Sequence, residues 1–175
     1  DGAYNLVSSH SKKFLTANRF DLAEKLLFLK FYENGMEKGF GRELYIEHQK
    51  AMNGLYEADG ENKFGQEQFI KTFVDVFTSI KNEGFNHESV VPIGIDSTVL
   101  DGAHRIASCI YTGKDSITVN IGLNPLNINY KFFKDRGLST VYLDAMANEY
   151  IEYKEDIYLA IVWPTGVQEN NQELE

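Results

Sequence analysis

Between Val90 and Ile121 an apolar strand turns through a glycine into a helix, in the run Asp101-Gly102-Ala103-His104-Arg105, here called the glycine box. A helix that begins at such a turn leaves its first backbone N–H groups without intrahelical partners, and its dipole adds positive charge at the same end. Glycine lets the backbone come close to an anion there. With His104 and Arg105 in the first turn, the glycine box predicts a phosphate-binding site.

Apolar positions at helical spacing predict further helices on both sides of this stretch. Helices are predicted over 20–32, 42–56, 69–82, 103–111 and 143–153, with a short one from Tyr130 toward Gly137. Strands are predicted over 91–95, 98–100, 117–121 and 157–163, and the first two are expected to form a hairpin around Asp96-Ser97. The polar residues 1–19 predict a loosely held lead-in, and the acidic residues 168–175 a disordered tail.

Composition narrows the class of protein. A chain of 175 residues with 43% hydrophobic residues suits one domain, residues 1–175, with a single sizeable core. A formal net charge of -9 opposes a nucleic acid as partner, although a local basic pocket could hold one nucleotide with Mg²⁺. No apolar run approaches the roughly 20 residues that cross a bilayer, so no membrane partner is expected.

The single cysteine, Cys109, allows neither a disulfide framework nor a zinc site built on thiolates. We therefore expect a reducing, cytoplasmic compartment. The start at Asp1, without an initiator methionine, is expected of a fragment or of a domain cut from a longer protein, so further domains could complete its function.

Three segments, Val91–Ile95, Thr98–Ala107 and Ile117–Ile121, resemble the core of the ParB/sulfiredoxin-like fold. That pattern is an amphipathic helix, a strand, a glycine-x-x-arginine box opening a second helix, and another strand. The match covers about residues 66–121. It implies an α+β fold, in which a small mixed sheet with packed helices is flanked by N-terminal helices and a C-terminal α/β extension.

Members of that family differ in their boxes, and the differences bear on function. Sulfiredoxins carry a catalytic cysteine immediately before the histidine, where this chain has Ala103. The DNA-segregation members continue into a helix-turn-helix region that is not evident after Ile121. The free serine kinases carry an aspartate-glycine-histidine-histidine-arginine box, from which this chain departs at one position. The resemblance to the kinases implies phosphoryl transfer from ATP or ADP, with Mg²⁺, to a small hydroxylated metabolite such as a serine-like compound or a sugar.

The same resemblance implies roles for individual residues. Gly102, Ala103 and the N–H groups that follow would hold nucleotide phosphates. Arg105 and His104 would offset charge during transfer, and Asp101 would help to hold Mg²⁺ or orient the acceptor. The serine kinases also use a catalytic glutamate upstream of the box.

Glu47 and Glu57 are the candidates for that glutamate, and no motif decides between them. His48 shares the predicted helix 42–56 with Glu47 and Tyr45. It is interpreted either as a histidine at the edge of the core with both nitrogens satisfied, or as a residue that approaches the substrate together with Tyr45 and Glu47.

Two other functions stay open. The chain could be a non-catalytic nucleotide-sensing or interaction module. In that case the box binds a nucleotide or is only a structural turn, with Asp101 as a helix cap and Arg105 in an ion pair. A ParB-like DNA-binding or nuclease domain would need a basic stripe, which the composition does not provide.

Overall fold

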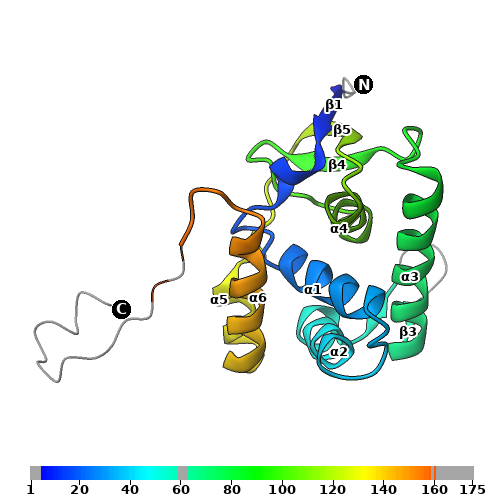
Figure 1. Ribbon diagram of the computed structural model, residues 1–175. Coiled ribbons are helices and arrows are strands. Elements are labelled where there is room, and N and C mark those ends of the chain that lie inside the picture. Colours follow the sequence, from blue (N-terminus) through cyan, green and yellow to red (C-terminus); the bar gives the residue numbers. More distant parts are fainter. Residues whose placement is uncertain (1–4, 59–62, 159, 161–175) are drawn as a thin grey trace, which may run out of the picture.

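The computed structural model describes residues 5–58, 63–158 and 160, and within these the chain is a mixed α+β protein (Figure 1). Its helices in the described part are α1 (Asp21–Glu33), α2 (Phe40–Asn53), α3 (Gln66–Glu83), α4 (Ala103–Thr112), α5 (Tyr130–Asp135) and α6 (Thr140–Glu152), with a short 3-10 helix at Ser11–Phe14. Its strands are β1 (Leu6–His10), β2 (Tyr56–Glu57), β3 (Lys63–Phe64), β4 (Val91–Gly94) and β5 (Ser116–Leu123). The predicted α+β class is confirmed.

The main sheet has the strand order β1-β5-β4. β5 lies in the middle, antiparallel to β1 and parallel to β4, and α4 connects the two parallel strands. Figure 1 shows α4 beneath this sheet, with α1 on the side of α4 away from the strands. β2 and β3 form a separate two-stranded ribbon.

The lead-in predicted for residues 1–19 is wrong for the part that the structure describes. β1 pairs with β5 from Leu6–Asn120 to His10–Ser116, and Phe14 and Leu15 are each only 1% exposed. The polar character of this segment reflects an edge strand whose side chains are mostly exposed. A polar strand of this kind carries little of the hydrophobic alternation that identifies strands in a sequence.

The larger of two clusters of buried apolar residues lies between the helices and the inner face of the sheet, and the second lies among α1, α2, α5 and α6. α3 contributes the apolar stripe Phe69, Phe73, Phe77 and Ile80, which is buried as its periodicity predicts. α4 packs between α1 and α3 and buries Ile106, Ala107, Cys109 and Ile110. This packing fixes the start of α4, and with it the glycine box, against α1 and α3.

Several predicted boundaries shift by a few residues. α2 ends at Asn53 rather than at residue 56, because Gly54 adopts a left-handed conformation with φ 69° and Tyr56 enters β2. The hairpin predicted at 91–100 is reduced to β4 and one antiparallel bridge between Ile93 and Val99. Most of the strand predicted at 157–163, and the whole tail at 168–175, lie outside the described residues.

None of the helices in the described part of the chain combines the length and the apolar character needed to cross a bilayer.

Candidate functional site

A cavity of about 570 Å³ opens at the glycine box. Its wall is formed by residues from α1, α2, the β2–β3 ribbon, α3, the start of α4 and α5. The lining side chains are Arg19, Asp21, Lys25, Gln49, Met52, Asn53, Glu57, Lys63, Thr72, Val76, Leu126, Ile128 and Phe132, together with residues 100–105. Small-molecule sites are typically cavities of about 300–1,000 Å³, so a nucleotide-sized ligand fits this volume.

The glycine box forms the turn that its sequence predicts. Gly102 has φ 84°, in the left-handed region that favours glycine, and α4 begins at the next residue. The Gly102 carbonyl accepts a hydrogen bond from the Ile106 N–H at 3.0 Å. Among the described residues, no side chain caps this end of α4. The first N–H groups of α4, from Ala103 to Arg105, therefore lie at the cavity wall without capping by a side chain.

Arg105 is held by its own neighbours. Its Nη1 donates to Ser89 Oγ at 2.6 Å and to the Ser89 carbonyl at 3.1 Å, and its Nη2 donates to Asp101 Oδ2 at 3.2 Å. The guanidinium packs so closely on Gly102 that a Cβ at that position would lie 2.5 Å from Nη2. The ion pair between Arg105 and Asp101 is the one expected of a structural turn, although both residues also border the cavity.

His104 is placed by two aromatic side chains. Its Nε2 lies 3.1 Å from the Tyr45 hydroxyl, and its ring stacks on Phe73 at 4.4 Å between centroids. Burial, together with the charges of Lys25 and Lys63, holds the pKa of His104 well below its usual value. A neutral imidazole offers a ligand a hydrogen bond but no positive charge.

The structure separates the candidates that the sequence left open. Glu57 lines the cavity, where its Oε2 lies 2.7 Å from Lys63 Nζ and its Oε1 accepts from Asn53 Nδ2 at 3.2 Å. Glu47 is absent from the cavity wall and instead pairs with Lys50 at 2.6 Å, with 43% of its side chain exposed. Glu57, and not Glu47, shares the cavity with the glycine box.

His48 is fully buried and does not line the cavity. Its ring lies 4.5 Å from that of Phe133, and its Nδ1 is 3.3 Å from Glu24 Oε2. It is a core histidine, as one of the two interpretations held. Its nitrogens make no hydrogen bond among the described residues, so the expected satisfaction of both is not seen.

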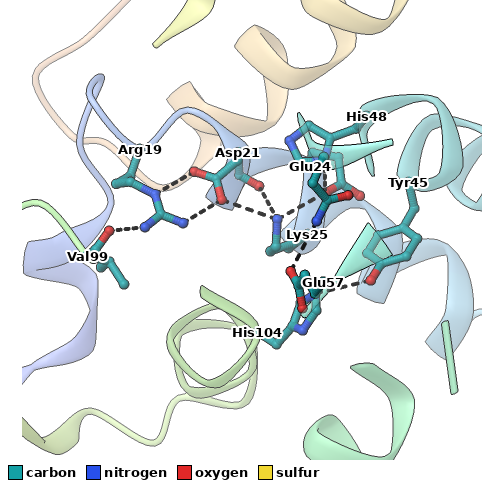
Figure 2. A network of polar contacts seen from close by, with 10 residues as sticks. Arg19, Asp21, Glu24, Lys25, Tyr45, His48, Glu57, Val99 and His104 are labelled. Atoms are coloured by element: carbon teal, nitrogen blue, oxygen red, sulfur yellow. Dashed lines mark hydrogen bonds and ion pairs between the residues drawn. The ribbon is translucent and has the colours of Figure 1, made fainter. Parts of the chain in front are cut away.

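Arg19, Asp21 and Lys25 form a buried ion cluster that the sequence did not reveal (Figure 2). Arg19 donates from Nε and Nη2 to the two carboxylate oxygens of Asp21, each at 2.7 Å, and from Nη1 to the Val99 carbonyl. Lys25 Nζ lies 3.2 Å from Asp21 Oδ2. Burial alone would raise the pKa of Asp21, but the charges of Arg19 and Lys25 hold it well below its usual value.

The sequence contained one signal for this cluster. Asp21, Glu24 and Lys25 lie on a helix that is otherwise mostly apolar, and charged residues are almost never fully buried unless they are paired. On a solvent-exposed helix, the same pattern is also common, because an aspartate favours the helix start and pairs with a lysine four residues later. Only the burial of all three residues distinguishes the two cases.

The balance of charge in the cavity is opposite to that of the chain. Among the residues that the structure describes, four cationic side chains line it, Arg19, Lys25, Lys63 and Arg105, against the three carboxylates Asp21, Glu57 and Asp101. The whole chain has a net charge of -9. A local positive excess in such a chain favours an anionic ligand.

The carboxylates of the cavity differ in their capacity for Mg²⁺. Both oxygens of Asp21 and of Glu57 are engaged by protein donors, whereas the Asp101 side chain is 70% exposed and paired through Oδ2. Among the described residues no group of three or more His, Cys, Asp or Glu side chains could hold a metal. Mg²⁺ commonly needs only one or two carboxylates beside waters and substrate phosphates, so Asp101 fits as a single protein ligand.

Comparison of the chain with protein-family models, with curated proteins and with solved structures gave no match in any of the three. The functional interpretation therefore depends on the geometry and charge of the cavity.

Proposed function

We propose that the protein is a nucleotide-dependent phosphotransferase that transfers a phosphoryl group to a hydroxyl of a small metabolite, such as a serine-like compound or a sugar. The supporting observation is that one cavity brings together the uncapped start of α4, the carboxylate of Glu57 and an excess of cationic side chains. Phosphoryl transfer depends mainly on positioning and on stabilisation of charge, so a small set of residues suffices.

In this proposal the N–H groups at Gly102 and Ala103 receive phosphates of ATP or ADP. Glu57 accepts the proton of the acceptor hydroxyl, and its contacts with Lys63 and Asn53 orient the carboxylate. A carboxylate has about four lone-pair sites, so two donors leave room for a third. His104, held neutral, contributes a hydrogen bond. Mg²⁺ bound at Asp101 would neutralise phosphate charge.

We further propose a ParB/sulfiredoxin-like core and a cytoplasmic location. The support for the core is the succession of α3, β4, α4 and β5 with the glycine box at the start of α4. The support for the location is a single cysteine, Cys109, which is buried.

The test compares Glu57→Gln with Glu47→Gln in transfer assays on a panel of hydroxylated metabolites. Loss of a general base typically costs about 10²–10⁴ in rate, so we expect Glu57→Gln to lower kcat by at least about 100-fold while nucleotide still raises the unfolding temperature. Glu47→Gln should transfer like the parent, because Glu47 lies outside the cavity. Equal rates for both variants would remove Glu57 from the mechanism.

A second candidate is a nucleotide-binding module without catalysis. The observation that favours it is the engagement of Arg105 by Ser89 and Asp101, which leaves this side chain in the structural role of supporting a turn. This candidate predicts that the parent protein is stabilised by nucleotide and transfers no phosphoryl group to any acceptor in the panel.

A further inference from the structure

Lys25 occupies an unusual position for a lysine. It is only 3% exposed, it projects from α1, and it lines the same cavity as the glycine box. Figure 2 shows its ammonium group joined by dashed contacts to Asp21 and Glu24. A buried ammonium costs several kcal/mol of desolvation unless partners at short distance compensate for it.

Among the described residues, Lys25 has partners only at long hydrogen-bond distances. Asp21 already accepts from Arg19 at 2.7 Å on each of its oxygens. Lys25 Nζ reaches Asp21 Oδ2 at 3.2 Å, the Asp21 carbonyl at 3.4 Å and Glu24 Oε2 at 3.5 Å. Charge-assisted hydrogen bonds of nitrogen to carboxylate are usually about 2.7–2.9 Å long. An ammonium with three donors therefore keeps capacity for a stronger acceptor.

Glu24 does not supply that acceptor. Neither of its oxygens makes a hydrogen bond among the described residues. Burial raises the pKa of Glu24 to about 8, so the carboxyl is mainly protonated at neutral pH. Arg19 and Asp21 balance each other, and burial lowers the pKa of His48 and of His104, which keeps both neutral. Among the described residues of this cluster, the positive charge of Lys25 therefore has no negative charge of its own to match it.

We propose that Lys25 binds a phosphate group of the ligand at the inner wall of the cavity, with Arg19 and Asp21 holding the ammonium in place. The residue is thus a second phosphate-binding element beside the start of α4. The inference rests on the proposed function only in placing a phosphate-bearing ligand in this cavity, and it requires no turnover.

Two sources could supply the phosphate: the polyphosphate of a nucleotide, or a phosphate carried by the acceptor metabolite. Calorimetric titrations with inorganic triphosphate and with inorganic phosphate distinguish them. Tighter binding of triphosphate by the parent identifies the nucleotide as the source of the phosphate, and tighter binding of inorganic phosphate identifies the acceptor. Acetate serves as a third probe, and binding of acetate alone would overturn the proposal.

The decisive variant is Lys25→Met, which keeps an unbranched side chain, shorter by one atom, and removes its charge. We expect it to bind the preferred phosphate probe at least tenfold more weakly than the parent. Lys71→Met is the matched control, since Lys71 is 75% exposed and does not line the cavity.

A measurement on the parent protein covers the case in which Lys25→Met does not fold. In protein labelled with ¹³C at lysine Cε, the preferred phosphate probe should shift the Lys25 signal and leave the Lys71 signal in place. An unmoved Lys25 signal, equal binding by Lys25→Met and the parent, or no binding of any probe would each overturn the inference.

Failure of the inference can be distinguished from failure of the proposed function. If Lys25→Met transfers phosphoryl groups with the KM of the parent, Lys25 is not a phosphate-binding residue and the phosphotransferase stands. If the parent binds triphosphate through Lys25 but transfers nothing, the reverse holds.

Discussion

Gly102 shows how one residue serves two requirements. Its φ of 84° is a backbone conformation that residues with a side chain rarely adopt, and its missing Cβ leaves space for the Arg105 guanidinium. Gly113, at the other end of α4, has a similar φ of 67°, but no atom of the described residues lies within 4 Å of the place where a Cβ would be. Substitution of Gly113 therefore introduces backbone strain alone, whereas substitution of Gly102 introduces the same strain and a steric clash with Arg105.

Alanine substitutions at these two positions should differ in their effect on stability. Gly113→Ala should lower the unfolding free energy by about 1–2 kcal/mol, because the alanine must adopt the left-handed conformation. Gly102→Ala imposes the same strain and also displaces Arg105 from Ser89 and Asp101. We therefore expect a larger loss of unfolding free energy, and weaker phosphate binding. Urea denaturation and calorimetry measure the two effects. Equal losses of stability would show that the packing of Arg105 on Gly102 contributes little.

At the scale of elements, α3 supports the site through Phe73. This side chain is fully buried, and its ring stacks on those of Phe28, Tyr45 and His104 at 5.2, 5.6 and 4.4 Å between centroids. The apolar stripe of α3 thus holds a cavity residue, His104, as well as the core. Core packing and site geometry are coupled at this point.

Phe73→Ala should therefore affect both stability and the site. Truncation of a buried phenylalanine typically costs about 3–5 kcal/mol, and loss of the stack also frees the His104 ring to change its orientation. Denaturant titration measures the first effect, and the chemical shifts of the His104 ring measure the second. Val141→Ala on α6, at a position that is 62% exposed, should change stability by less than about 0.5 kcal/mol. A cost at Phe73 as small as that at Val141 would contradict the packing described.

At the scale of the whole molecule, the buried charges link stability to pH. Burial raises the pKa of Glu24 from its ordinary value of 4.5 to about 8, so the folded state retains a proton that the unfolded chain releases. The contribution of Glu24 to stability is complete below pH 4.5 and is lost as the pH rises through 8. Asp21 acts oppositely, because its lowered pKa favours the folded state above its ordinary value of 3.8.

Glu24→Gln isolates this effect from the other titrating groups that face Glu24, namely Asp21, Lys25, Tyr45 and His48. Between pH 5 and 8 the unfolding free energy of the parent should fall relative to that of the variant. The steepest slope against pH should correspond to a difference of one bound proton between the folded and unfolded states. Denaturation curves measured at several pH values check this expectation. A constant difference between the two proteins would mean that Glu24 is ionised in the folded state throughout this range.

The sequence predicted most of the local structure for reasons that are themselves local. Apolar periodicity located α1, α3 and α4, and the glycines at 84, 102 and 113 marked ends of α3 and α4, because backbone conformation and amphipathic spacing are properties of neighbouring residues. The turn and uncapped helix start of the glycine box could be predicted on the same basis. β1 could not, since its pairing partner lies more than 100 residues away along the chain.

The composition of the cavity was decided by tertiary structure. Arg19 donates to the carbonyl of Val99 from a position 80 residues away. Glu57 rather than Glu47 shares the cavity with the glycine box because α2 ends at Asn53 and the chain turns at Gly54 into β2. Which charges become buried together depends on how α1 packs on α4, and no spacing within a single helix specifies that packing. The sequence by itself therefore determined most of the helices and the turn of the glycine box, whereas long-range packing determined which side chains surround that turn.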